Sequence, residues 1–219
     1  IETDVNEGSA ILNNDGSYTF DPGVDFQDLP QGATRDVFFT YYASDPYGNS
    51  ETKTITITVM GVNDAPIADD GTNTAQEDGV IINGVVTSAD VDTGSTLTYT
   101  LLTNVIEGSA VLNNDGTYTF DPGNNFQGLA QNETQDVSFT YKATDDLNQD
   151  SNIATITITV TGVNDLPTAE DGTNTAVEDG GTISGSVNTA DVDSDGIISH
   201  MIETDVNEGS AILNNDGSY

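Results

Sequence analysis

The 219-residue chain has no cysteine, no tryptophan, one histidine and only three basic residues. Without cysteine it can form no disulfide and has no thiol chemistry, and zinc would lack its usual nitrogen and sulfur ligands. A Ser-His-Asp constellation could occur once at most, because His200 is the only histidine. Paired carboxylates for glycoside hydrolysis are available in number, but no tryptophan platform accompanies them. We therefore expect that the chain is not an enzyme.

Long apolar runs are also missing: none approaches the roughly 20 residues that a transmembrane helix needs, so we expect no membrane insertion. Against 37 Asp and Glu, three basic residues leave a net charge of −34. We expect no nucleic-acid partner, because so few cations cannot neutralise phosphates. A net charge of this size repels itself unless cations compensate it. Composition leaves three explanations open: a solvated acidic surface, adaptation to salt water, or bound calcium.

An internal repeat organises the chain. Gly-Val-Asn-Asp-x-Pro occurs at residues 61–66 and again at 162–167, an offset of 162 − 61 = 101. Each copy follows a run in which threonine alternates with isoleucine or valine, a period typical of a half-buried strand. The proline that closes each copy has no N–H to donate, so it ends the strand. We call residues 61–66 the first joint and residues 162–167 the second joint.

The repeat length predicts the domain organisation. A period near 100 residues matches one immunoglobulin-sized domain and is far longer than a solenoid repeat. Residues 1–18 and 202–219 are identical, so both ends of the chain lie at the same phase of the repeat, as in a piece of a longer tandem array. We predict the C-terminal part of a β-sandwich repeat at 1–62 (the N-segment), a complete repeat at 63–164 (the middle repeat) and the N-terminal part of the next repeat at 165–219 (the C-segment).

Within the middle repeat, the strand pattern favours an antiparallel β-sandwich of about seven short strands. Asp115-Gly116 supplies the positive φ of a hairpin turn, and Gly84 is expected to form a β-bulge in its strand. No stretch shows a convincing helical period, so we expect an all-β fold. The expected strands are 80–86, 97–101, 110–112, 117–120, 137–141 and 153–160. The expected core phenylalanines are Phe20, Phe26, Phe39, Phe120, Phe126 and Phe139.

Acidic runs are the strongest local signal. Asp191-Val192-Asp193-Ser194-Asp195-Gly196 places carboxylates at alternate positions before a glycine, which can wrap oxygens around calcium. The middle repeat keeps Asp90-Val91-Asp92, and a weaker run spans 145–150. The twelfth position of the first run is Ile202 rather than glutamate, so it is not an EF-hand. The alternative is that each run is a solvated turn, since Asp, Asn and Gly favour turns.

Taken together, these motifs resemble the bacterial cadherin-like, VCBS-type tandem repeats of large, type I-secreted adhesins. The matching features are the two joints, Glu-Asp-Gly at Glu77 and Glu178, and Ala-Asp-Val-Asp at Ala89 and Ala190. Two longer motifs agree as well, Asn-Asp-Gly-x-Tyr-Thr-Phe-Asp-Pro-Gly in the first two repeats and Phe-Thr-Tyr-x-Ala-x-Asp before the closing strand. The resemblance covers essentially the whole chain. It implies tandem immunoglobulin-like, cadherin-like β-sandwiches on a bacterial cell surface or secreted outside the cell.

The resemblance also implies calcium as the cofactor, bound where consecutive domains meet. The implied ligands at the first joint are Asn63, Asp64, Asp90, Asp92 and Asp145, and those at the second are Glu77, Glu133, Asn164, Asp165, Asp191 and Asp193, with Asp195 in the same run. Asp45 would face a joint that precedes Ile1.

Departures from the cadherin pattern suggest fewer ions per joint than in cadherins. Gly61 and Gly162 stand where cadherins carry an aspartate. Ala65 and Leu166 replace an asparagine, and Ala33 occupies the position of Glu133.

The function that follows from the resemblance is mechanical: an extender of an adhesin or surface fibre, stiffened by calcium between its domains. One alternative is an adhesion module that binds surface polysaccharide or protein through Tyr41, Tyr42, Tyr47 or Tyr141. Another is a filament in which the C-segment of one copy completes the N-segment of the next.

Overall fold

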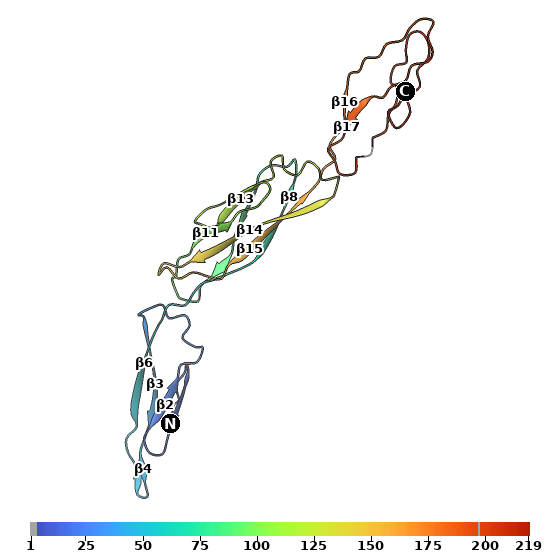
Figure 1. The fold of residues 1–219 in the computed structure, drawn as a ribbon. Coiled ribbons are helices and arrows are strands. Elements are labelled where there is room, and N and C mark those ends of the chain that lie inside the picture. The colour runs from blue at the N-terminus through green and yellow to red at the C-terminus, as the bar shows by residue number, and fades with distance from the viewer. Residues whose placement is uncertain (1–3, 197) are drawn as a thin grey trace.

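The computed structural model describes residues 4–196 and 198–219, and this part of the chain is all-β, without helices. No helix in that range is long and apolar enough to cross a membrane. Figure 1 shows an elongated molecule in which the N-segment, the middle repeat and the C-segment follow one another along one line. The two ends of the chain therefore lie in bodies at opposite ends of the molecule.

Two facing sheets build the middle repeat, which confirms the predicted all-β sandwich. The larger sheet has the strand order β11-β14-β15-β8, with β8 and β15 parallel and the other pairs antiparallel; the smaller has the order β12-β13-β9. Their bounds are β8 Gly71–Gln76, β9 Ile82–Val85, β11 Thr98–Thr103, β12 Ser109–Leu112, β13 Thr117–Asp121, β14 Thr134–Thr144 and β15 Ala154–Thr161. A short antiparallel pair, β7 (Ile67–Ala68) and β10 (Ser88–Ala89), lies beside them.

The alternation of β15 produces the core. Ile156, Ile158 and Val160 are at most 3% exposed, while the threonines between them point away from the core. Phe120 and Phe139 of the facing sheets are fully buried, and Tyr118 packs edge-on against Phe139 with 5.1 Å between ring centroids. Burial of this aliphatic and aromatic surface is the main force that holds the two sheets together.

The N-segment contains the later strands of the same pattern. The β1–β2 hairpin (Ser9–Leu12 and Tyr18–Asp21) repeats β12–β13, and β3 (Thr34–Tyr41) pairs with β6 (Lys53–Met60) as β14 pairs with β15. A small hairpin, β4 (Ser44–Asp45) with β5 (Gly48–Asn49), extends from the end of this segment. All the predicted core phenylalanines except Phe20 are buried; Phe20 is only half-buried in this smaller cluster.

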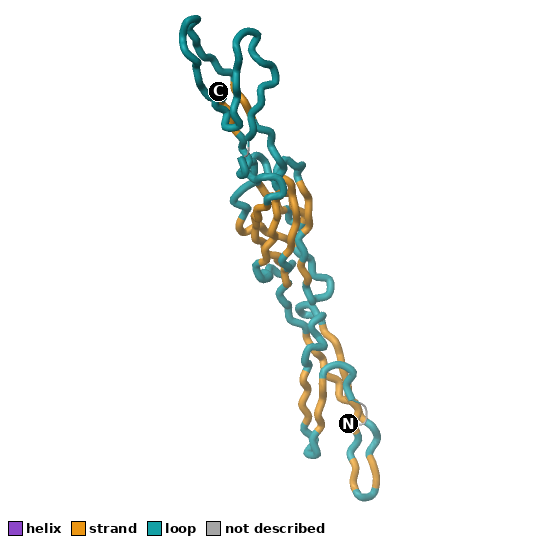
Figure 2. The backbone as a smooth tube through the Cα atoms, turned by 90° about the vertical axis from the view of Figure 1, so that its right-hand side faces the viewer, coloured by secondary structure: helices purple, strands orange, loops and turns teal. Residues whose placement is uncertain are grey.

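In the C-segment the described strands are β16 (Thr168–Glu170) and β17 (Asn188–Ala190), which pair with each other. Figure 2 shows the remainder of this segment as extended loop. No sheet of the described chain contains strands from both sides of either joint. The exact boundaries of the three segments stay a prediction.

The expected bulge at Gly84 is wrong. Gly84 lies opposite Tyr118 in an uninterrupted antiparallel register. A Cβ at this position would lie 2.2 Å from the Tyr118 ring, so glycine is required because the tyrosine ring lies directly over the backbone. Gly185 meets Tyr219 in the same way, since a Cβ there would lie 2.4 Å from the Tyr219 hydroxyl oxygen.

We predict that Gly84→Ala destabilises the middle repeat by about 1–3 kcal/mol, because the added methyl group forces the Tyr118 ring out of its packed position. Urea unfolding followed by tyrosine fluorescence measures the loss. Gly48→Ala is the control, since no atom lies within 4 Å of the added carbon. Equal stability of the Gly84→Ala variant and the unmodified chain would contradict the proposed packing.

Candidate functional site

At the first joint, carboxylates of the middle repeat hold the backbone of the joint. The Asp64 N–H donates to Asp92 Oδ2 (2.9 Å), and the Asn63 side-chain amide donates to Asp145 Oδ2 (2.7 Å). The other carboxylate oxygen of Asp92, Oδ1, is buried and accepts no hydrogen bond. The Asp92 N–H donates to Asp90 Oδ1 (2.9 Å). The structure thus brings together all five residues predicted for this joint.

Asp145 is placed by the loop after β14. Its Oδ1 accepts the N–H groups of Leu147 (2.9 Å) and Gln149 (2.7 Å), and its other oxygen is left to face Asn63. The side chain of Gln149 also accepts from Asn63 (3.0 Å). Although burial raises the pKa of the Asp145 carboxyl, the hydrogen bonds from Asn63 and from these N–H groups outweigh it, so the pKa is lowered.

The second joint repeats the central contact. The Asp165 N–H donates to Asp193 Oδ2 (3.1 Å), and the Asp193 N–H donates to Asp191 Oδ1 (3.0 Å). The middle repeat adds Glu77, whose Oε1 accepts the Val163 N–H (2.6 Å). These contacts attach the second joint to Glu77 of the middle repeat on one side and to the acidic loop of the C-segment on the other.

Glu133 reaches the same loop from the other side. Its Oε2 accepts the Ser194 hydroxyl (2.5 Å) and the Ala130 N–H (3.0 Å), and these bonds lower the pKa of its carboxyl. The Ser194 N–H donates to the Gly128 carbonyl (2.9 Å). The Asn164 side-chain amide donates to the Asp165 backbone carbonyl rather than to the side chain of another predicted ligand.

The joints bury negative charge without a partner. Glu77, Asp92 and Asp193 are 1%, 5% and 6% exposed. One oxygen of each, together with Asp165 Oδ2, is buried and has no hydrogen-bond partner. A buried, unpaired carboxylate is costly, and native proteins usually pair such a group or use it to bind a cation.

Electrostatics at the second joint point the same way. Burial raises the pKa of the Glu77 carboxyl, although the hydrogen bond from the Val163 N–H acts to lower it. The nearby negative charges of Asp165, Asp78 and Asp193 raise the pKa further. The pKa of Asp165 is also raised, first by burial and then by Asp78, Asp193 and Asp191. These carboxylates repel one another, so their charged forms are disfavoured unless positive charge is supplied.

The basic side chains of the protein do not supply this positive charge. Arg35 pairs with Glu7 (2.9 Å) and Asp28 (2.6 Å), Lys53 with Glu51 (2.9 Å), and Lys142 with Asp150 (2.5 Å). None of these ion pairs includes a joint carboxylate. Among residues 4–196 and 198–219, no three acidic or histidine side chains are gathered closely enough to form a ready-made metal cluster. Any cation would therefore also depend on backbone carbonyl, amide and water oxygens, as calcium does in proteins.

Close backbone packing explains the glycine that begins each joint. A Cβ on Gly61 would lie 2.3 Å from the Leu29 carbonyl oxygen, and one on Gly162 would lie 2.3 Å from that of Ala130. Each glycine is fastened to the preceding loop by hydrogen bonds, such as Gly162 N–H to the Glu133 carbonyl (2.8 Å). An aspartate cannot occupy this position without moving the backbone. The expectation of fewer ions per joint stays a prediction.

Two predicted ligands lie apart from these contacts. Asp195 is exposed and hydrogen-bonds no joint residue, although it continues the acidic run. Asp45 is exposed and closes its own hairpin by accepting the Tyr47 and Gly48 N–H groups (2.9 Å each). The sequence analysis did not predict a role for Asp78, whose charge raises the pKa of Glu77 and of Asp165. Its position directly after Glu77 could have indicated this role.

The comparisons with known proteins agree with this architecture. Residues 63–162 match the model of the bacterial cadherin-like domain, and residues 1–58 match that of the bacterial Ig domain. The middle repeat is a bacterial cadherin-like domain. Domains of this family are extracellular, adhesion-type modules; the narrower VCBS assignment stays a prediction. Curated protein sequences give no significant match.

Solved structures show the fold. The protocadherin gammaB7 EC3-6 cis-dimer is 17% identical with a TM-score of 0.58, covering 97% of this chain and 57% of that one. The protocadherin gammaB4 extracellular domain is 17% identical with a TM-score of 0.52, covering 100% of this chain and 37% of that one. This chain thus spans little more than half of the first structure and about a third of the second. An endo-fucoidan hydrolase of glycoside hydrolase family 107 also aligns, but its TM-score of 0.31 supports no inference about activity.

We predict that, in a chelator, Glu77→Gln raises the stability of the middle repeat by about 1 kcal/mol, because it removes a buried charge that burial and its neighbours disfavour. For a domain of about 100 residues this is a rise of roughly 4–8 °C in Tm, measured by calorimetry. Glu178→Gln, the exposed counterpart in the C-segment, is the control and should leave Tm unchanged. A lower Tm for Glu77→Gln in the chelator would show that the charge is already compensated.

Proposed function

We propose that this chain is part of an extracellular stalk, in which calcium bound at each joint holds consecutive cadherin-like domains in a stiff line. The observation that carries the proposal is the set of buried carboxylate oxygens without partners, all of which lie at the two joints. Calcium prefers oxygen ligands and tolerates irregular geometry, so this donor set suits it.

At the first joint the residues that would hold the ion are Asp92, Asp90 and Asp145, with Asn63 and Asp64 from the joint itself. Asp92 presents a buried, free oxygen, and its other oxygen already fixes the Asp64 backbone. Calcium would supply the positive charge that neutralises these carboxylates and would draw their oxygens together.

At the second joint the corresponding residues are Glu77, Asp165, Asp191 and Asp193, with Glu133 beside them. Glu77 belongs to the middle repeat and Asp193 to the C-segment, so a cation shared by them would connect the two segments directly. The side chains of Glu77, Asp191, Asp193 and Glu133 are each oriented by a hydrogen bond at this joint, and Asp165 is held through its backbone N–H. The same contacts therefore position the ligands and set the angle between neighbouring domains.

Mechanical stiffness follows from this arrangement. Domains joined by a short linker with a small interface normally move relative to each other. At the second joint a rotation would pull Glu77 of the middle repeat and Asp193 of the C-segment away from a shared ion, so bound calcium would oppose bending. It would also offset the mutual repulsion of a chain with a net charge of −34.

Calcium titration of the full chain tests the proposal. At a calcium concentration 100 times the Kd, one site stabilises the folded state by about 2.7 kcal/mol, so we predict a rise in Tm of roughly 10–20 °C for the middle repeat. Small-angle scattering should show a longer, stiffer particle than in a chelator. Sodium chloride at matched ionic strength separates charge screening from binding.

Two variants place the effect at the second joint. Asp193→Asn should reduce the calcium-dependent rise in Tm, because it removes the charge of a buried carboxylate that has one oxygen without a hydrogen-bond partner. Asp195→Asn makes the same charge change at an exposed position two residues away and should keep the response. If calcium changes neither Tm nor the scattering of the unmodified chain, the acidic residues form only a solvated surface and the proposal fails.

A further inference from the structure

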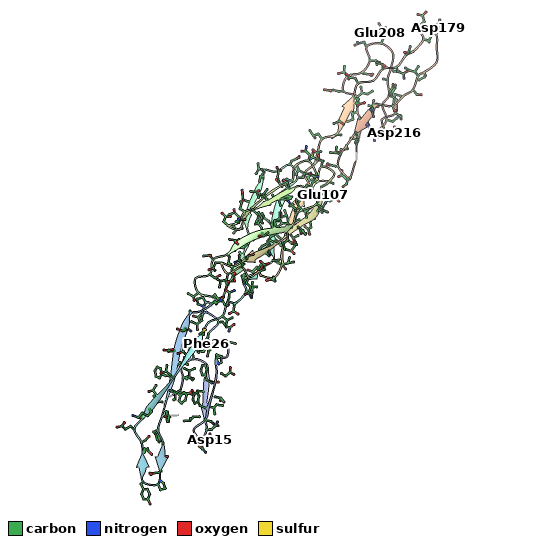
Figure 3. The ribbon with its side chains drawn as sticks, turned by 60° about the vertical axis from the view of Figure 1, so that its left-hand side comes forward. Asp15, Phe26, Glu107, Asp179, Glu208 and Asp216 are labelled. Atoms are coloured by element: carbon green, nitrogen blue, oxygen red, sulfur yellow. The ribbon has the colours of Figure 1, made fainter. Side chains whose placement is uncertain are left out.

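The two joints differ at one position beside the acidic loop of the following repeat. In Figure 3 Phe26 marks the end of the N-segment near the first joint, and Glu107 marks the end of the middle repeat near the second. At the second joint Glu133 accepts the Ser194 hydroxyl (2.5 Å), so a carboxylate of the middle repeat contacts the loop directly. The corresponding residue at the first joint is Ala33, whose side chain accepts no hydrogen bond.

The same backbone turn holds both positions. The Ala33 N–H donates to the Pro30 carbonyl (2.9 Å), and the Glu133 N–H donates to the Ala130 carbonyl (2.8 Å). The carbonyl of each residue then accepts the N–H of the glycine that begins its joint (2.9 and 2.8 Å). Because the backbone is the same, the side chain is the difference, and the turn at either joint can carry a glutamate.

The following repeat approaches this turn in the same way at both joints. The Thr93 N–H donates to the Asp28 carbonyl at the first joint (3.1 Å), and the Ser194 N–H donates to the Gly128 carbonyl at the second (2.9 Å). Thr93 also carries a hydroxyl group in the place of the Ser194 hydroxyl. A glutamate at the first joint would therefore meet the same hydroxyl donor that Glu133 meets at the second.

Neighbouring charges around this turn do not offset the difference. At the first joint Arg35 pairs with Asp28 (2.6 Å), so one positive and one negative charge cancel. Their counterparts at the second joint are Gln135 and Gly128, which are both uncharged. Arg35 and Gln135 each also contact the glutamate two residues before β1 or β12, so this charge is common to both joints. Around this turn the second joint is therefore more negative by the charge of Glu133.

We propose that the residue at position 33 or 133 sets the calcium affinity of its joint, and that Glu133 makes the second joint bind calcium more tightly than alanine would. The inference rests on the calcium binding proposed above. Ser194, which Glu133 contacts, directly follows Asp193, whose Oδ1 is buried and has no hydrogen-bond partner. A negative charge in contact with this loop attracts a divalent cation, and the number of charged groups tunes the Kd of calcium-binding loops.

Unequal affinities have a mechanical consequence. At a calcium concentration between the two Kd values, the joint with glutamate would hold its ion while the joint with alanine would still bend. The residue at this position would thus decide which joints of the stalk are stiff at a given calcium concentration.

A calcium titration of the full chain followed by NMR tests the proposal, because it observes the two joints separately. The amide signal of Asp64 reports on the first joint and that of Asp165 on the second, since these N–H groups donate to Asp92 and Asp193. Each variant is compared with the unmodified chain at the same joint, so all other differences between the two joints cancel.

Substitutions at the exposed Glu133 should act on the second joint. Glu133→Ala and Glu133→Gln should each raise its calcium Kd about fivefold or more, and the Kd of the first joint should stay unchanged. Glu133→Gln keeps an oxygen that can accept from Ser194, so its effect isolates the charge from the hydrogen bond.

The reverse substitution should act on the first joint. Ala33→Glu should lower its calcium Kd by a similar factor, because it adds the missing carboxylate beside the loop. Gln31→Glu is the matched control: it adds the same charge at an exposed position two residues away and should change the Kd of neither joint. Circular dichroism should show that all variants keep the fold.

Three results would overturn the proposal. The first is an unchanged Kd of the second joint in Glu133→Ala. The second is an effect of Glu133→Ala without any effect of Glu133→Gln, which would assign the affinity to the hydrogen bond rather than to the charge. The third is an equal effect of Gln31→Glu and Ala33→Glu, which would show a general effect of charge.

The titration also distinguishes this inference from the proposed stalk. If calcium moves neither amide signal in the unmodified chain, calcium-stiffened joints and this inference fail together. If calcium moves both signals but the variants leave both Kd values unchanged, the stalk stands and this inference alone fails.

Discussion

Burial of carboxylates without a cationic partner is the constraint on which the joints depend. Glu77, Asp92 and Asp193 are almost fully buried, and one oxygen of each has no hydrogen-bond partner. The other oxygen of each accepts a backbone N–H of a joint residue. The same side chain therefore stabilises the joint through one oxygen and destabilises it through the other. A bound divalent cation would resolve this conflict, because it would neutralise the charge and leave the backbone contacts in place.

The β-sandwich is the scaffold that makes such burial possible. The alternating threonine strands β6 and β15 end at the first and second joint. The Asn-Asp pair of each joint then lies near the acidic loop of the repeat that follows. Glycine at the start of each joint permits the backbone to lie against the preceding loop, which leaves no space for a carboxylate there. Ligands are thus concentrated on the domain edges, where a shared ion would link two bodies that otherwise have little common surface.

Much of the fold followed from sequence periodicity. The period of two predicted β6 and β15, and Asp115-Gly116 predicted the β12–β13 hairpin, because these signals are local. The prediction of a bulge at Gly84 was wrong. Glycine is required there because the ring of Tyr118, more than 30 residues away in sequence, lies over the backbone, and a local sequence pattern does not reveal such a contact. The hydrogen bonds Asp64–Asp92 and Asp165–Asp193 bring together residues that the cadherin resemblance implied as ligands, and their binding of calcium stays a prediction. The effect of Asp78 was missed because it acts through space on charges across the joint.

Amide hydrogen exchange at Asp64 and Asp165, measured by NMR with and without calcium, probes the joints most directly. Their N–H groups donate to Asp92 and Asp193, the buried carboxylates at the two joints, so their exchange reports the opening of these joint contacts. Calcium-bridged joints predict that exchange at both amides slows by at least tenfold when calcium is added, while amides in the centre of β15 change much less. Unchanged exchange at Asp64 and Asp165 in saturating calcium would contradict calcium-bridged joints.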